Sequence, residues 1–213
     1  VIVSFGNENK STVVRADSSW LVSFKKQKAN RLPQSIRIRS VEDSIELKNI
    51  LVGDLWLCIG QSNMQWPLSQ EMHFRSEVEY ADQPLLRFYD PTYAGEDIYN
   101  SSFTDSVISR LNTNDFYKGE WQQSDSNTAK SMSAVGYYFG KTILIKENVP
   151  VGLIDLAIGG APIETFISKT TLQSHSGFAE KTKANWLNNT ALPVWIRERA
   201  QQNIGGQNAV AKD

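Results

Sequence analysis

A short apolar run that ends at a glycine constrains the fold of this chain more than any other feature. Residues 55–59 are all apolar, and Gly60, Gln61 and Ser62 follow them directly. Such a run, stopped by glycine, is typical of a strand buried inside a parallel sheet. A serine on the sharp turn after that strand stands clear of the sheet, as the nucleophiles of acyl-transfer enzymes do. The alternative for a bare Gly-x-Ser sequence is an ordinary strand-to-helix turn in which Ser62 caps the next helix.

The segments after this run predict an α/β fold. Residues 85–89 and 153–158 are predicted strands, and residues 133–147 are a predicted helix, because apolar residues recur there at steps of three and four. A helix that leads into a buried strand fits a doubly wound, mostly parallel sheet. Active sites in such sheets lie outside the carboxyl ends of the strands. Ser62 and the pair Gly159-Gly160 both fall at ends of this kind.

The remaining segments have weaker patterns. Five short alternating segments, at 1–5, 12–15, 20–24, 35–39 and 45–47, are separated by polar turns, the first at 6–9, and predict a β-sandwich. Residues 92–130 lack a clear period and are expected to be irregular. Near the end we predict a turn or short helix at 186–192, a helix at 194–202 and a break at 205–208. The predicted division is therefore a β domain at 1–52 and an α/β domain at 53–213.

Composition excludes several classes of function. The 22 basic residues nearly balance the 23 acidic ones, so charge gives no argument for binding nucleic acid or an anionic membrane. Cys58 is the one cysteine; it lies in the predicted buried strand, is expected to be a core residue, and excludes an intrachain disulfide. No CxxC pair, His-rich spacing or phosphate loop occurs, so neither a metal nor a nucleotide cofactor is expected. No apolar run approaches the ~20 residues of a membrane span. The sequence begins with Val1 and not Met, so we expect residues to precede it, and the lack of a signal peptide says nothing about compartment.

Two blocks of the sequence resemble a known family. The string 52–68, which contains Ser62, resembles the nucleophile block of the sialate O-acetylesterases, which belong to the SGNH-hydrolase group. Residues 149–168 resemble the second block of that family, in which a strand ends in a Gly-Gly turn whose backbone N–H helps to form the oxyanion hole. Ala161 stands where Thr is common and Phe166 where Trp is common. Neither difference touches the backbone donors.

The resemblance implies a fold and an activity. The fold would be an SGNH-type doubly wound sheet, partial in this chain and preceded by part of a β-sandwich domain. The activity would be removal of O-acetyl groups from sialic acids by serine acyl transfer without a cofactor, with acetylxylan as the alternative substrate. The resemblance also implies an extracytoplasmic location, which is periplasmic, secreted or lysosomal.

Within this hypothesis individual residues take roles. Ser62 would be the nucleophile, and its own N–H together with that of Gly160 or Gly159 would hold the oxyanion. Gln61 and Asn63 are interpreted as residues that position the turn or the substrate. Glu164 either orients the second block or is a solvent-facing carboxylate at the start of a helix.

The acid–base pair that such a serine needs is not recognisable in the sequence. A serine hydrolase requires a base and a carboxylate that orients it, and the family supplies both from an Asp-x-x-His element far downstream. Gln70 and Leu172, and not Asp, stand three residues before His73 and His175. We expect His73 at the surface, which leaves His175 as the alternative base within the chain.

The chain is therefore predicted to be the front half of an esterase. The missing pair would belong to a second polypeptide produced by proteolysis, or to sequence that follows residue 213. A non-catalytic carbohydrate-binding or structural protein of the same fold is the rival hypothesis.

Overall fold

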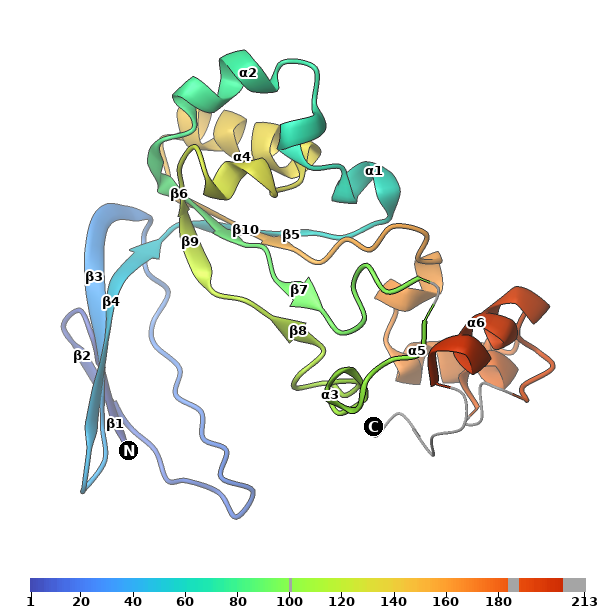
Figure 1. Cartoon of the computed structure of the whole chain (residues 1–213). Coiled ribbons are helices and arrows are strands. Elements are labelled where there is room, and N and C mark those ends of the chain that lie inside the picture. Colours follow the sequence, from blue (N-terminus) through green and yellow to red (C-terminus); the bar gives the residue numbers. More distant parts are fainter. Residues whose placement is uncertain (100, 184–187, 205–213) are drawn as a thin grey trace.

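The computed structural model of this chain describes residues 1–99, 101–183 and 188–204 (Figure 1). Two four-stranded sheets follow one another along the sequence, and the strands of a two-stranded sheet are inserted between β6 and β9 of the second one. The first sheet is antiparallel, with the order β2-β1-β3-β4. Its strands are β1 (Ile2–Phe5), β2 (Glu8–Ser11), β3 (Asn30–Arg39) and β4 (Ser44–Val52).

The second sheet is mixed and has the order β5-β10-β6-β9. Its strands are β5 (Asp54–Cys58), β6 (Gln83–Tyr89), β9 (Trp121–Ser124) and β10 (Val151–Asp155). Strand β10 pairs in parallel with both β5 and β6, whereas β9 is antiparallel to β6. The sheet is thus mixed: β5, β10 and β6 run in the same direction, as predicted, and β9 at the edge runs the other way. That the sheet is doubly wound stays a prediction.

Short elements connect and extend these sheets. The helices, apart from α4, are α1 (Ser62–Gln65), α2 (Phe74–Glu77), α3 (Asp105–Ile108), α5 (Lys169–Ser174) and α6 (Val194–Ile204). The 3₁₀ turns are η1 (Leu68–Gln70), η2 (Val78–Tyr80), η3 (Thr128–Lys130), η4 (Ile163–Phe166) and η5 (Ala179–Thr182), and the small sheet joins β7 (Thr92–Tyr93) to β8 (Tyr117–Lys118). Within the described ranges no helix is long and apolar enough to cross a membrane.

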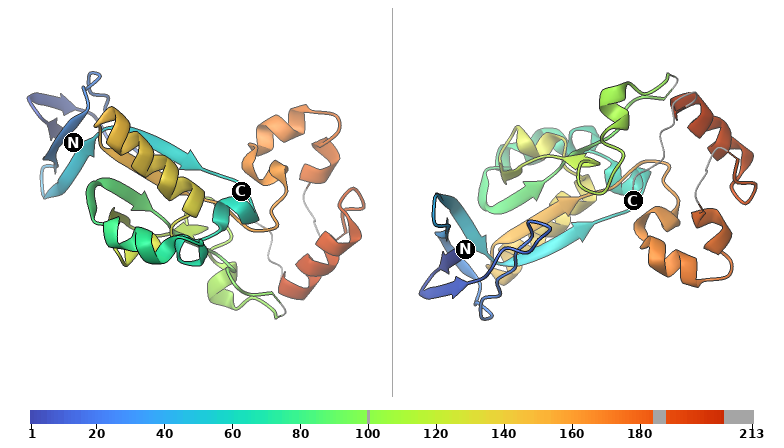
Figure 2. Two further views of the ribbon diagram at one scale, coloured as in Figure 1. Left: turned by 90° about the horizontal axis from the view of Figure 1, so that it is seen from above. Right: turned by 90° about the horizontal axis from the view of Figure 1, so that it is seen from below.

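Helix α4 (Ala134–Glu147) is the longest helix, and it confirms the predicted helix at 133–147. The Ser133 side chain caps its start by accepting a hydrogen bond from the Gly136 N–H at 3.1 Å. Asn148 ends it in the left-handed conformation with φ 55°, which is a common way to stop a helix. Seen from above, the helix lies along the sheet (Figure 2).

The core of the second sheet forms beneath this helix. Phe88 of β6, Leu153 of β10 and Tyr137 of α4 are each at most 1% exposed. The Phe88 and Tyr137 rings lie 6.3 Å apart between centroids. The helix comes so close to β10 that a Cβ added to Gly140 would lie 2.8 Å from Leu153 Cδ1. Close packing of aromatic and branched side chains therefore fixes α4 on one face of the sheet.

The first fifty residues differ from the prediction in three segments. The segments 12–15 and 20–24 form no strand, so these two predicted strands are wrong. The predicted turn at 6–9 is shorter than expected, because Phe5 pairs with Glu8 and leaves two residues in the turn of a tight hairpin. Strand β2 is the result. The described residues of this region form one antiparallel sheet; that it is part of a sandwich, and a domain separate from 53–213, stays a prediction.

The later segments match more closely. Strand β6 and helix α6 confirm the predictions at 85–89 and 194–202, and β10 lies two to three residues earlier than predicted. The stretch 92–130 was expected to be irregular but contains β9, which sequence reasoning missed because its residues are mostly polar. The predicted break at 205–208 and the first residues of the segment 186–192 lie outside the described residues.

The junction between the two sheets generates a stability prediction. Strand β4 ends at Val52 and β5 begins at Asp54, whose N–H donates to the Pro150 carbonyl at 2.9 Å. A Cβ added to Gly53 would lie 2.0 Å from that same carbonyl oxygen. Gly53→Ala should therefore lower the free energy of unfolding by about 1–3 kcal/mol, as overpacking against a rigid group does.

Denaturant unfolding of the two proteins would measure this loss. Gly177→Ala is the matched control, because its new Cβ would meet His175 at an ordinary 3.4 Å. Equal stability of Gly53→Ala and the unsubstituted chain would contradict the close approach of β5 to Pro150.

Candidate active site

The turn that carries Ser62 leaves the carboxyl end of β5. Ser62 is exposed and is the first residue of α1. The residue that caps this helix is Gln61, so the alternative in which Ser62 is the cap is wrong. Gln61 Oε1 accepts hydrogen bonds from the Ser62 hydroxyl at 2.8 Å and from the Ser62 N–H at 3.3 Å. Gln61 thus contacts the serine side chain directly; a role for it in positioning the turn or the substrate stays a prediction.

The Gly159-Gly160 turn runs beside the serine turn. Beyond the paired strands, the Leu156 N–H donates to the Cys58 carbonyl and the Ile158 N–H to the Gly60 carbonyl, each at 3.0 Å. The two segments therefore continue side by side past the end of the sheet. Gln65 of α1 completes the link, because its Oε1 accepts the Gly159 N–H at 2.7 Å.

Gly160 differs from Gly159 in its backbone. Its φ of 77° lies in the left-handed region, which a residue with a side chain adopts at a cost. Among the described residues its N–H has no hydrogen-bond acceptor, whereas that of Gly159 is taken by Gln65. Gly160 is consequently the better placed of the two to donate to a bound group.

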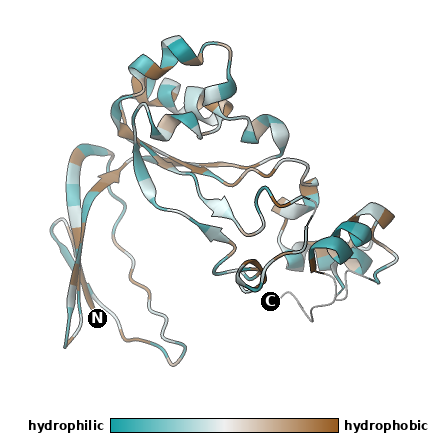
Figure 3. Ribbon diagram, in the orientation of Figure 1, coloured by the Kyte–Doolittle hydropathy of each residue, from teal (hydrophilic) through white to brown (hydrophobic). Residues whose placement is uncertain are grey.

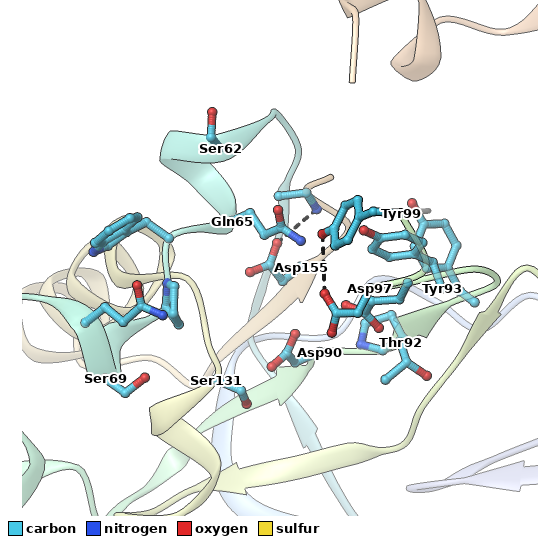
Figure 4. Close-up of a pocket in the computed structure, with 17 residues that line it drawn as sticks. Ser62, Gln65, Ser69, Asp90, Thr92, Tyr93, Asp97, Tyr99, Ser131 and Asp155 are labelled. Atoms are coloured by element: carbon cyan, nitrogen blue, oxygen red, sulfur yellow. Dashed lines mark hydrogen bonds between the residues drawn. The ribbon is translucent and has the colours of Figure 1, made fainter. Parts of the chain in front are cut away.

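A cavity of about 670 Å³ opens next to Ser62 (Figure 4). Its walls carry aromatic and carboxylate side chains together with Ser62 and Gln65. The aromatic residues are Trp66, Tyr93, Tyr99 and Tyr117, and the carboxylates are Asp90, Glu96, Asp97 and Asp155. In Figure 4 the Ser62 hydroxyl lies on the rim and points away from the carboxylates. Aromatic rings and hydrogen-bond acceptors are the groups with which proteins hold polar ring-shaped ligands.

Asp155 is the most buried of these carboxylates, at 8% exposed. It is the last residue of β10, and it accepts hydrogen bonds from the Ser133 N–H at 3.2 Å and the Ala157 N–H at 3.1 Å. Burial raises the pKa of Asp155 to about 6, and the nearby Asp90 carboxylate adds to the rise, while the two N–H donors oppose it. The Asp155 carboxyl therefore connects β10 to the start of α4. Its contribution to the free energy of unfolding depends on pH, because its pKa is raised.

Two further carboxylates of the cavity are also perturbed. Burial raises the pKa of Asp90, and a hydrogen bond from Ser131 opposes that rise. The pKa of Glu96 is raised chiefly by burial. Asp97 accepts the Tyr99 hydroxyl at 3.3 Å. Several acidic groups thus line one cavity, and burial perturbs at least three of them.

The other residues singled out from the sequence do not line this cavity. Glu164 pairs with Lys181 at 3.5 Å, and Asn63 is exposed on α1. His175 ends α5, where its Nδ1 accepts the Gly177 N–H and its ring packs on Phe178. His73 precedes α2 at the surface, as expected. Neither histidine lines the cavity beside Ser62.

Cys58 confirms the prediction of a core residue. It is 6% exposed, and burial raises the pKa of its thiol to about 11. In the described ranges, no group of three or more His, Cys, Asp or Glu side chains could hold a metal ion.

Comparison with known proteins gives the site its context. No protein-family model matches the chain. Sialate O-acetylesterases from Pongo abelii and Homo sapiens are 28% and 27% identical to it over 173 residues, which cover 78% of this chain and 31% of each relative. A crystal structure of a carbohydrate acetylesterase from Xanthomonas citri matches with a TM-score of 0.66 at 26% identity, over 82% of this chain and 37% of that one.

The chain is a homologue of the sialate O-acetylesterases. It spans about a third of the length of the curated relatives that it matches.

Sequence reasoning missed three residues at the candidate site of this sialate O-acetylesterase homologue, namely Asp90, Asp155 and Gln65. Asp90 and Asp155 stand directly after or at the end of the strands β6 and β10, so the rule that locates sites at the carboxyl ends of strands could have found both. Gln65 carries no such signal. Its role depends on a contact with Gly159, which is 94 residues away in the sequence.

The raised pKa of Asp155 predicts how the stability of this homologue changes with pH. Because the pKa of about 6 in the folded state lies above the ordinary aspartate pKa of 3.8, the native state holds the proton more tightly than the unfolded chain does. The contribution of Asp155 to the free energy of unfolding should therefore fall as the pH rises from about 4 to about 6, by roughly 1–3 kcal/mol.

Unfolding in denaturant at several pH values would measure this change. Asp155→Asn carries no charge and should lack that component, so its profile should be flatter than that of the unsubstituted chain. Asp54→Asn, at an exposed position, is the control and should keep the original slope. Parallel profiles for Asp155→Asn and the unsubstituted chain would rule out Asp155 as the source.

Proposed function

We propose that this chain supplies the nucleophile and part of the oxyanion hole of a carbohydrate O-acetylesterase. The observation that carries the proposal is the position of Ser62, on a turn after β5, beside the Gly160 turn and on the rim of a cavity. The Ser62 oxygen would attack the carbonyl carbon of an acetyl group while its proton passes to a base. The sugar would leave with its hydroxyl group restored by that proton, and water would then release acetate from the serine.

The negative oxygen formed by that attack needs preorganised N–H donors. The N–H of Gly160 would be one donor, since no described residue accepts a hydrogen bond from it. The N–H of Ser62 is the other, and the incoming oxygen would replace its hydrogen bond to Gln61. Losing one such donor typically lowers the rate ~10²–10³-fold. Gly159 then has a positioning role, because Gln65 holds its N–H.

The base is expected to come from outside the described residues of this chain. His73 and His175 do not line the cavity, and the family draws on a downstream Asp-x-x-His element. We propose that a polypeptide equivalent to the unmatched part of the relatives supplies that element, either joined to this chain or separate from it. By the same resemblance, the protein would work outside the cytoplasm.

Replacement of Ser62 tests the proposal directly. In the longest polypeptide that the gene encodes, Ser62→Ala should lower the hydrolysis of aryl acetates and acetylated sugars by about 10³–10⁶-fold with folding intact, as loss of a triad serine does. The 213-residue chain alone should be nearly inactive.

Ser69→Ala is the matched control, because Ser69 is also exposed and lines the same cavity. It should keep most of the activity. Near-normal turnover of Ser62→Ala would refute the nucleophile assignment. An unsubstituted protein that binds acetylated sugars without hydrolysing them would support the non-catalytic rival.

A specific observation bears on the sugar. Asp90, Glu96, Asp97 and Asp155 all line the cavity beside Ser62. A sialic acid carries its own carboxylate, and like charges in a partly buried space repel one another. The acidic wall therefore favours a neutral acetylated sugar, such as acetylxylan, over O-acetylated sialic acid, which the names of the curated relatives suggest.

Removing the charge of the substrate separates the two candidates. At low salt, we expect kcat/KM to be about tenfold higher for the methyl amide of an O-acetylated sialic acid than for the free acid. At high salt this difference in kcat/KM should become smaller, because salt screens the repulsion. Asp97→Asn should also narrow it, whereas Asp54→Asn, outside the cavity, should not. A free acid that is hydrolysed as fast as its amide would restore sialic acid as the preferred substrate.

A further inference from the structure

Helix α6 holds the loop between β7 and α3 through hydrogen bonds to its backbone and side chains. The Phe103 N–H donates to the Asn203 carbonyl at 2.8 Å, and the Ser102 hydroxyl donates to the Gln202 carbonyl at 3.2 Å. In the other direction, the buried Asn203 side chain donates to the Ser101 carbonyl at 3.0 Å. These contacts join two segments that lie about 100 residues apart in the sequence.

The contact between α6 and the loop is polar. Figure 3 colours most of α6 as hydrophilic. The buried residues of the helix are Asn203 and Ile204, which stand at its end. Hydrogen bonds require a defined distance and angle, whereas apolar contacts have no preferred direction. The polar contacts of α6 therefore fix the position of the loop more closely than apolar packing would.

Arg199 of α6 connects these contacts to Tyr99. Its Nε donates to Asn203 Oδ1 at 2.9 Å, and its Nη2 donates to the Ile98 carbonyl at 3.4 Å. Its guanidinium lies 5.6 Å from the centroid of the Tyr99 ring. The face of an aromatic ring attracts a cation at this distance. Because two hydrogen bonds restrict the guanidinium, Arg199 holds the Tyr99 ring in place.

The rest of the Tyr99 ring is open to the cavity. Tyr99 lines the cavity beside Ser62 and is 57% exposed. Its hydroxyl donates to Asp97, which lines the same cavity. In Figure 4 both residues lie on the wall across from Ser69. A ring that is held by a cation and by its own hydroxyl loses little conformational freedom when a ligand packs on it.

We propose that Tyr99 is the platform on which this cavity binds the ring of a neutral acetylated sugar. The C–H groups on one face of a pyranose ring would pack on the exposed part of the aromatic ring. A sugar hydroxyl would donate to Asp97, because a carboxylate can accept more hydrogen bonds than the one from Tyr99. Arg199 and Asn203 do not line the cavity, so they are positioning residues that act through Tyr99.

The platform determines specificity, and this step rests on the proposed function. Ser62 and Tyr99 line one cavity of about 670 Å³, a volume within the range of about 300–1,000 Å³ that is typical of small-molecule sites. A sugar packed on Tyr99 would therefore share this space with an acetyl group at Ser62. The platform contacts the sugar and not the reacting carbonyl. Its loss should weaken substrate binding and leave the chemical step largely unchanged.

Steady-state kinetics with two esters test the platform. The longest polypeptide that the gene encodes is assayed with an acetylated xylo-oligosaccharide and with ethyl acetate, which carries no sugar. Tyr99→Ala should raise KM for the oligosaccharide about tenfold and change kcat by less than about twofold, as loss of uniform binding does. For ethyl acetate, kcat/KM should change by less than about threefold, because this ester does not reach the platform.

Tyr80→Ala is the matched control. Tyr80 is 64% exposed and has the Lys141 ammonium 5.7 Å from its ring centroid, but it does not line the cavity. This variant should leave KM for the oligosaccharide unchanged. Tyr99→Phe keeps the ring and should raise that KM by no more than about threefold. Arg199→Gln leaves Tyr99 without its cation and should raise the same KM about threefold, with kcat/KM for ethyl acetate unchanged.

Three outcomes would overturn the platform. The first is an equal KM for the oligosaccharide in Tyr99→Ala and the unsubstituted protein. The second is an equal loss of kcat/KM on both esters in Tyr99→Ala, which would make Tyr99 a residue of the fold and not of sugar binding. The third is an unsubstituted protein that neither binds nor hydrolyses the acetylated xylo-oligosaccharide.

Calorimetric binding of the same oligosaccharide separates this proposal from the proposed nucleophile. Ser62→Ala should bind it, and adding Tyr99→Ala should weaken that binding about tenfold. Weaker binding in the double variant together with retained activity of Ser62→Ala would refute the nucleophile and leave the platform standing. Equal binding by the two proteins together with an inactive Ser62→Ala would refute the platform and leave the nucleophile standing.

Discussion

Parallel pairing between β5 and β10 is the interaction on which the candidate active site depends. The ladder runs from Asp54 opposite Val151 to Cys58 opposite Asp155, and it continues through the hydrogen bond from Ile158 to Gly60. Because the register of a ladder sets the relative height of its strands, the turns that carry Ser62 and Gly160 leave the sheet at the same level. Two segments far apart in the sequence thereby become one site, and Gln65 locks them together through Gly159.

At the same edge of the sheet, opposing effects act on the charge of the Asp155 carboxylate. Asp155 accepts the N–H of Ser133 at the start of α4, a position where a helix favours negative charge. Burial and the neighbouring Asp90 act against that charge, and the net effect is a raised pKa. A group that fixes the geometry of a site while remaining unfavourable as an anion is a common compromise at functional positions. The acidic wall that results is the basis on which we propose a neutral sugar as the substrate.

The candidate nucleophile lies next to an exposed edge strand of the sheet. Ser62 follows β5, whose residues Leu55 and Leu57 are exposed although the sequence predicted a buried strand. Ser62 as the nucleophile and a base from another segment are part of the proposed function, whereas the pairing of β5 with β10 on one side only is an observation. The homologues are long enough to contain further segments, since this chain matches only about a third of their length.

Elements that local sequence specifies were predictable. Strand β6 and helix α4 follow from periodicity, and the start and end of α4 follow from Ser133 and Asn148. The serine turn followed from the glycine after an apolar run. The sequence did not predict strand β2, and it predicted strands at 12–15 and 20–24 that do not form. A strand exists only when a partner pairs with it, and the partners lie elsewhere in the sequence.

The site divides in the same way. The sequence by itself determined that Ser62 and Gly160 stand on turns after strands, because residue type and apolar runs specify turns locally. Only the tertiary structure decided that Asp90 and Asp155 share a cavity with Ser62, that Gln65 holds Gly159, and that β5 lies at an open edge. These features depend on the order of strands in the sheet, and that order is set by long-range hydrogen bonding and packing, which no local pattern encodes.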